Sequence, residues 1–267
     1  MNQLNVNLPE LPYAVSEAMN RLRINIKFCG KNTRKILLTS CQPNEGKSTI
    51  SAYLWKMLAE AGFPTVLVDV DLRKSVMKTR FQMDYDDDTT MGLNHYLSGM
   101  AEYEDVVYST NIPNGYMVPC TQLLENPSAL LEDVRFKELL NTLSENYRFV
   151  IIDSPPLGSV ADGALIASLC DGAVLVVRAG TTPRTLIKQS LYEIQQSGCR
   201  LLGTVLNRAD VKGRAYGKYG YGKYGYGYGY GYGYGYEPKD KKNSSDSAAA
   251  DTVSYTHLRA HETSAHL

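Results

Sequence analysis

Short apolar runs alternate along this chain with longer amphipathic stretches. The short runs are rich in Ile, Leu and Val at successive positions, which is typical of strands buried on both faces of a sheet. The longer stretches carry apolar residues at helical spacing and have Gly or Pro near their ends. This alternation predicts an α/β fold, a mostly parallel sheet flanked by helices, with ligands at the carboxyl ends of the strands. The predicted strands are 36–40, 65–70, 148–153, 173–178 and 201–206, and the predicted helices are 47–62, 127–147, 161–170 and 183–198.

The alternation stops beyond Val211, and a different composition follows. From Tyr216 to Tyr236 the chain contains ten tyrosines and nine glycines. Glycine at alternate positions removes side chains that a strand would pack and raises the entropic cost of order, so a flexible, disordered tail is predicted. A sticky low-complexity segment without further function is the alternative. The expected organisation is an N-terminal self-association and adaptor segment (1–34), a catalytic domain (35–212), the Tyr/Gly-rich tail (213–237) and a disordered linker with a non-native end (238–267).

The non-native end is inferred from the last stretch, VSYTHLRAHETSAHL, which resembles translated sequencing-adapter sequence. We therefore expect the residues after about 252 not to belong to the natural protein.

Charge and apolar content exclude several classes of partner. The 267 residues include 28 basic and 28 acidic side chains, which gives no footprint for nucleic acid. No apolar run approaches the ~20 residues that a bilayer span needs, and the start lacks the layout of an export signal. The cysteines are odd in number, scattered and without a CxxC pair, as expected in a reducing cytosol: Cys29, Cys41, Cys120, Cys170 and Cys199.

A phosphate-binding loop is predicted at TSCQPNEGKST, between a strand and a helix. Such a loop needs exposed backbone N–H groups, a lysine for the β- and γ-phosphates and a hydroxyl for Mg²⁺. Gly46, Lys47 and Ser48 supply these, whereas Cys41 stands where the usual first glycine would be. The context is that of a P-loop NTPase-like fold.

Three carboxylates follow predicted strands of the same sheet. Asp69 and Asp71 are two positions apart, so both side chains are expected on one side of the pleat beside the loop. Asp153 ends another strand, where it is placed to hold Mg²⁺ directly or through water.

These motifs resemble the Walker A, Walker A′ and Walker B motifs of bacterial tyrosine kinases, in particular the cytoplasmic Firmicute type associated with capsule and exopolysaccharide synthesis. The similarity extends roughly from Tyr13 to Arg208. It implies ATP and Mg²⁺ as cofactors and assigns roles to matching positions. Lys47 would bind phosphates, Asp69 or Asp71 would deprotonate the incoming phenol, and Arg73 would neutralise developing charge unless it forms a surface salt bridge. The implied nucleotide contacts are Asn44, Glu45, Gly46, Lys47, Ser48, Thr49 and Asn207, with helix capping as the alternative for Asn207, and the implied metal ligands are Ser48, Asp71 and Asp153.

The resemblance also gives the tail a role, because a tyrosine-rich C-terminus is this family's autophosphorylation site. It implies a homo-oligomer in the cytoplasm, recruited to the inner face of the membrane by a transmembrane adaptor of the polysaccharide co-polymerase type, and a protein tyrosine phosphatase that resets the tail. The candidate acceptors are Tyr216, Tyr219, Tyr221, Tyr224, Tyr226, Tyr228, Tyr230, Tyr232, Tyr234 and Tyr236.

The family's assembly motif, E-x-x-R-x-x-R, is only partly matched. Glu17 and Arg23 fit, but Asn20 occupies the position of the middle arginine and Arg21 lies next to it. A neighbouring arginine points about 100° round a helix, so ring-shaped self-association is less well supported than the activity.

An ATP-driven switch of the ParA/MinD type, which phosphorylates no protein, is the alternative function. Those proteins usually have a second lysine near the start of the phosphate loop, where this chain has Ser40, and they lack a tyrosine cluster.

Overall fold

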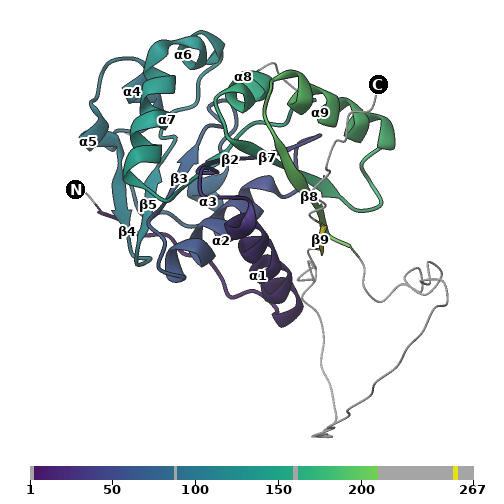
Figure 1. Ribbon diagram of the computed structural model, residues 1–267. Helices are drawn as coiled ribbons and strands as arrows, with labels where there is room; N and C mark the ends of the chain where they lie inside the picture. Colours follow the sequence, from purple (N-terminus) through teal and green to yellow (C-terminus); the bar gives the residue numbers. More distant parts are fainter. Residues whose placement is uncertain (1–2, 87–88, 159–161, 210–254, 258–267) are drawn as a thin grey trace, which may run out of the picture.

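A single mixed sheet forms the centre of the molecule (Figure 1). The computed structural model describes residues 3–86, 89–158, 162–209 and 255–257. Over these ranges the strand order is β1-β4-β5-β3-β6-β2-β7-β8-β9, and only the β4–β5 and β8–β9 pairs are antiparallel. The strands are β1 (Gln3–Leu4), β2 (Lys35–Ser40), β3 (Thr65–Asp69), β4 (Tyr108–Thr110), β5 (Gly115–Val118), β6 (Phe149–Asp153), β7 (Gly172–Arg178), β8 (Leu201–Asn207) and β9 (Tyr255–His257).

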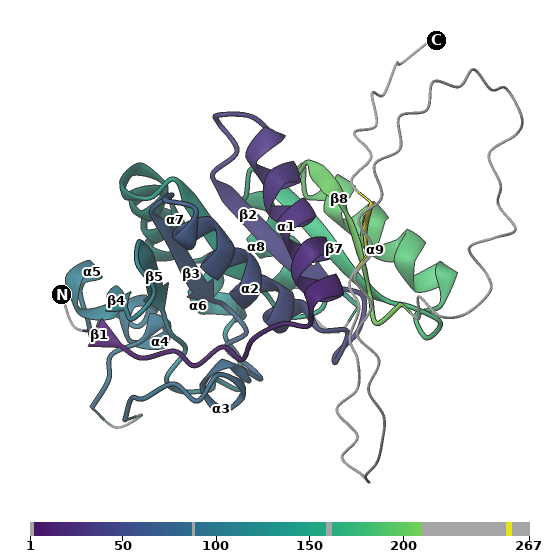
Figure 2. The same ribbon diagram turned by 90° about the horizontal axis from the view of Figure 1, so that it is seen from below.

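Helices cover both faces of this sheet (Figure 2). They are α1 (Tyr13–Phe28), α2 (Lys47–Glu60), α3 (Met77–Arg80), α4 (Leu93–Leu97), α5 (Tyr103–Val106), α6 (Ser128–Glu132), α7 (Val134–Asn146), α8 (Asp162–Ser168) and α9 (Arg184–Gln196). Successive strand residues enter opposite cores, as the period of two requires: in β2, Leu37 packs on the α7–α9 side, while Ile36 and Leu38 pack on the α1–α2 side. The predicted α/β architecture is confirmed.

The five predicted strands are the adjacent strands β3, β6, β2, β7 and β8 of the sheet. One predicted helix is wrong: residues 127–147 form two helices, α6 and α7, instead of one. Asp133 breaks the segment because its backbone is extended and its carboxylate accepts a hydrogen bond from the Arg135 N–H at 2.9 Å, so that it caps α7.

The N-terminal segment is built into the core. β1 pairs with β4, and α1 buries Val15, Met19, Leu22 and Ile26 against the helix that follows the phosphate loop. The strand β9 pairs with the edge of β8, within a stretch that was expected to be disordered. The tyrosine-rich tail lies outside the described residues. No helix in the described ranges combines the length and apolar character of a membrane span.

Candidate active site

The phosphate loop joins the end of β2 to the start of α2. Two of its residues have left-handed backbone conformations, Asn44 with φ 65° and Gly46 with φ 95°. Gly46 is needed on a second ground, because a Cβ there would lie 2.1 Å from the side-chain nitrogen of Asn207. The loop and the end of β8 are therefore in direct contact. Any side chain at position 46 would clash with Asn207 and prevent this contact.

Two of the predicted nucleotide contacts hold the loop in shape. One carboxylate oxygen of Glu45 accepts hydrogen bonds from the backbone N–H groups of Cys41 at 2.7 Å and Gln42 at 3.0 Å, and the other accepts one from the Thr182 hydroxyl. Asn207 is buried and donates its side-chain N–H to the Glu45 carbonyl at 2.8 Å. This contact places Asn207, at the end of β8, against the residue that precedes Gly46, the N-cap of α2.

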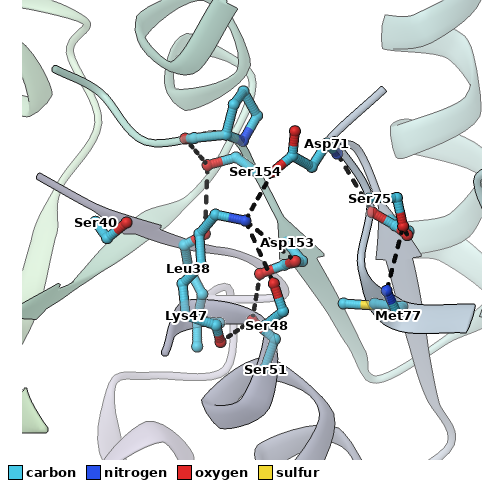
Figure 3. Close-up of polar contacts among 12 residues, drawn as sticks. Leu38, Ser40, Lys47, Ser48, Ser51, Asp71, Ser75, Met77, Asp153 and Ser154 are labelled. Carbon is cyan, nitrogen blue, oxygen red and sulfur yellow. Dashed lines mark hydrogen bonds and ion pairs between the residues drawn. The ribbon is translucent and has the colours of Figure 1, made fainter. Parts of the chain in front are cut away.

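Lys47 is the centre of the charge arrangement (Figure 3). Its ammonium lies 3.0 Å from Asp71 Oδ2 and 3.5 Å from Asp153 Oδ2, and all three side chains are at least nine-tenths buried. Burial lowers the pKa of Lys47, but Asp153 and Asp71 outweigh it, so the net shift is upward. The lysine is thus charged and serves as counter-ion to carboxylates from two different strand ends.

Asp153 has unused coordinating capacity. Its Oδ1 accepts a hydrogen bond from the Ser51 hydroxyl at 2.9 Å, while Oδ2 is the one buried side-chain oxygen or nitrogen in the described residues without a hydrogen-bond partner. Burial raises the pKa of this carboxyl. A carboxylate oxygen that has an ion pair with Lys47 but no hydrogen bond, near the Ser48 hydroxyl, fits Mg²⁺, which takes few protein ligands and relies on substrate phosphates for others. Consistent with that, no group of three acidic, histidine or cysteine side chains in the described ranges forms a metal cage of its own.

The two aspartates after β3 have different environments. Asp69 is buried, accepts a hydrogen bond from the Ser75 hydroxyl and lies outside the cavities described below. Burial, with Asp153 as the next cause, raises its pKa to about 8. Asp71 lines a cavity and accepts the Lys47 hydrogen bond. Of the two aspartates predicted as the base, Asp71 is the one that borders a described cavity.

Arg73 is engaged in a network that the sequence did not predict. Its Nε donates to Asp162 Oδ2 at 2.7 Å, and its other nitrogens donate to the Glu125 carbonyl and the Ser128 hydroxyl. Ser128 in turn donates to Asp162 Oδ1 at 2.6 Å. Arg73 and Ser128 both hold the pKa of Asp162 below its usual range, against the effect of burial. Arg73 thus forms a salt bridge, but with a buried carboxylate rather than at the surface as the alternative stated, and this pair ties the Walker A′ loop to α6 and α8.

Two cavities adjoin the phosphate loop. A cavity of about 220 Å³ lies above Lys47 and Ser48 and is also lined by Asp71, Pro155 and Pro156. A larger one, about 530 Å³, lies beside Asn207 and the start of α1. The structure thus brings Asn44, Gly46, Lys47, Ser48, Asp71, Arg73 and Asp153 around the smaller cavity or its floor, and Thr49 and Asn207 around the larger one.

Comparison with known proteins gives the family. A domain family described as "AAA domain" matches residues 33–195. The tyrosine-protein kinase CpsD of Streptococcus agalactiae is 41% identical over 208 residues, which cover 78% of this chain and 90% of that protein. The chain belongs to the bacterial tyrosine-protein kinases. The predicted resemblance is confirmed, and with it the assignment as a protein-tyrosine kinase.

Solved structures of the kinase family and of an ATPase of the alternative class both share this fold. The kinase domain of the Escherichia coli tyrosine kinase ETK has a TM-score of 0.68 and 27% identity, covering 80% of either chain. The septum site-determining protein MinD from Pyrococcus horikoshii, complexed with Mg-ADP, has a TM-score of 0.55 and 26% identity, covering 66% of this chain and 71% of its own. The family and the fold both imply nucleotide binding with Mg²⁺ in general terms.

Replacing Lys47 tests the charge arrangement. Lys47→Met should lower tyrosine phosphorylation at least about 100-fold, because a cation is lost from the phosphates. It should also lower the free energy of unfolding by about 3 kcal/mol, because buried carboxylates lose their counter-ion. Lys56→Met on the same helix is the control, since among the described residues Lys56 pairs only with the half-exposed Glu60, at 3.8 Å. Phosphotyrosine immunoblots and urea titrations measure both effects, and wild-type labelling in Lys47→Met would contradict this site.

The pH dependence of stability tests the environment of Asp69. Its pKa rises from 3.8 to about 8 on folding, so the folded state holds the proton more tightly. The stability from this group is complete below its unfolded pKa and is lost as pH rises toward 8. The free energy of unfolding of the wild type, measured against Asp69→Asn, should therefore fall by at least about 1 kcal/mol between roughly pH 5 and 8. Exposed Asp84→Asn serves as control. A constant difference across this range would show that Asp69 is ionised throughout.

Proposed function

We propose that this kinase transfers the γ-phosphoryl group of ATP to tyrosines of its own C-terminal tail, between subunits. The observation that carries the proposal is the Lys47 ammonium held between Asp71 and Asp153 at the floor of a cavity. The tail supplies ten tyrosines close behind the catalytic domain. A site built for phosphoryl transfer and a cluster of acceptors thus occur in one chain.

ATP and Mg²⁺ would contact different residues of the site. Lys47 would bind the β- and γ-phosphates, and Ser48, Asp153 and Asp71 would hold the metal ion. Bound Mg²⁺ neutralises charge on the transferring phosphoryl group. A phosphate bound at Lys47 would compete with Asp71 for the ammonium, so Asp71 would have oxygen lone pairs available for the phenol proton as well as for the metal ion.

Asp71 is the group that accepts the phenol proton. A tyrosine hydroxyl has a pKa near 10 and is a poor nucleophile at neutral pH, so it requires a neighbouring base. Asp71 lines the smaller cavity together with Pro155 and Pro156, whose rings offer an apolar wall to an aromatic acceptor. Asp69 positions the loop through its contact with Ser75 and with the Asp71 N–H at 3.3 Å.

Deleting the tail tests its role as acceptor. A chain ending at Arg208 should lose most autophosphorylation, while ADP binding by calorimetry stays within about twofold, because the site residues all precede the cut. A chain ending at Glu237 is the matched control and should label like the full chain. Labelling of the shorter chain at the control level, detected with radioactive ATP, would place the acceptors in the catalytic domain.

The outer face of α1 is the proposed self-association surface. Glu17 and Arg21 are exposed and four positions apart, so they lie on one side of the helix, and Tyr13 and Phe28 are 81% and 78% exposed. Arg23 is partly used internally, since its Nε donates to Asn20 Oδ1 at 3.0 Å. Asn20, which stands where the motif has an arginine, thus holds the Arg23 side chain that the motif would present to a neighbouring subunit.

The wider role is regulation of capsular or extracellular polysaccharide synthesis and export. In this proposal the kinase is cytoplasmic, is recruited and activated by the cytoplasmic end of a transmembrane adaptor, and is reset by a protein tyrosine phosphatase. The family relation supports these partners.

Phosphorylation should loosen the assembly. Each phosphotyrosine adds about −1.5 to −2 charges, so modified tails repel one another and the acidic site. Light scattering at moderate salt should show a multi-subunit protein whose mass falls after incubation with ATP and Mg²⁺. Arg21→Glu should reduce the starting mass and Arg21→Lys should preserve it. A mass that stays constant or grows with ATP contradicts the release step, and a monomer in both states contradicts the assembly.

A further inference from the structure

One arginine lines both cavities of the active site. Arg80, at the end of α3, borders the smaller cavity above Lys47 and also the larger cavity beside Asn207. Among the residues described as lining the two cavities, Asn44 and Gly46 are the only others that line both. Arg80 therefore lies at their junction, across from the phosphate loop.

The contacts of Arg80 leave most of its guanidinium free for an anion. One nitrogen donates to the Thr49 hydroxyl at 3.0 Å, in the first turn of α2. The side chain is exposed, and within the described ranges it forms no ion pair. Arg73, in contrast, has its guanidinium occupied by an ion pair with Asp162 and by hydrogen bonds to two further acceptors.

The two cavities have different linings, which suit different parts of an ATP molecule. The larger one has apolar walls from the N-terminal segment and α2, no acidic residue in its lining and a volume suited to a nucleoside. The smaller one holds Lys47 and Asp71, where transfer takes place. The phosphates that join these two parts must pass the junction at Gly46 and Arg80.

We propose that Arg80 binds the α- and β-phosphates of the bound nucleotide, closing over them from the side opposite the phosphate loop. The inference rests on the proposed use of ATP and adds a ligand from outside the Walker motifs. A planar guanidinium donates two parallel hydrogen bonds to phosphate oxygens, a geometry that lysine does not offer. The Thr49 hydroxyl holds Arg80 toward the loop before the nucleotide arrives.

ADP binding by the full chain, measured by calorimetry with Mg²⁺, tests this proposal. Arg80→Met should weaken ADP binding about tenfold or more, and Arg80→Lys should restore part of the loss. Thr49→Val should have a smaller effect, because the cation remains. Arg200→Met is the matched control and should leave ADP affinity within about twofold, since Arg200 is an exposed arginine just before β8 that bonds the Cys29 carbonyl and the Thr33 hydroxyl and lines neither cavity.

The outcomes separate this inference from the function on which it rests. Unchanged ADP affinity in Arg80→Met overturns the inference while the kinase proposal stands, and a loss confined to ATP overturns the placement at the α- and β-phosphates. A wild-type chain that binds neither nucleotide overturns both. Arg80 is exposed and makes a single hydrogen bond to the fold, so circular dichroism should show a folded variant.

Discussion

The site depends on one buried positive charge set among three buried carboxylates. Lys47 lies against Asp71 and Asp153. In the described part of the chain, Asp69 forms no ion pair. The electrostatic cost of three negative charges at this depth is reduced because Asp69 retains a proton, as its pKa of about 8 indicates. A parallel sheet makes this possible, since its strand ends converge on one edge and bring β2, β3 and β6 together.

The loops around this charge cluster are fixed by contacts that do not themselves reach a substrate. Thr182 and Asn207 hold the phosphate loop through Glu45, and Asp162 with Ser128 holds Arg73 on the Walker A′ loop. Each of these contacts joins segments that are far apart in the sequence. The catalytic geometry is consequently a property of the assembled sheet, and a change at Asp162 or Asn207 acts on the chemistry through the position of a loop.

The sequence predicted the centre of the fold because buried parallel strands and the phosphate loop have strong local signals. Five adjacent strands and the side chains Lys47, Asp71 and Asp153 were found in this way. The elements between α3 and β5 were not predicted, because they are three to five residues long and their stability comes from packing rather than from local periodicity. The partners of Arg73 and the position of Arg80 could not be predicted either, since both depend on how α3 and α8 fold back over the loop.

The contact between Asn207 and the phosphate loop also sets where the tail leaves the catalytic domain. β8 ends at Asn207, so the proposed acceptor segment follows in sequence from the rim of the proposed nucleotide site. An extended chain spans at most about 3.3–3.6 Å per residue, so Tyr216 has a reach of about 25 Å from Ala209, whereas Tyr226, far in sequence from both Ala209 and the strand β9, has a reach on the order of 60 Å. Chain length thus grades the proposed acceptors by the distance they could cover, from the vicinity of one site to the sites of neighbouring molecules.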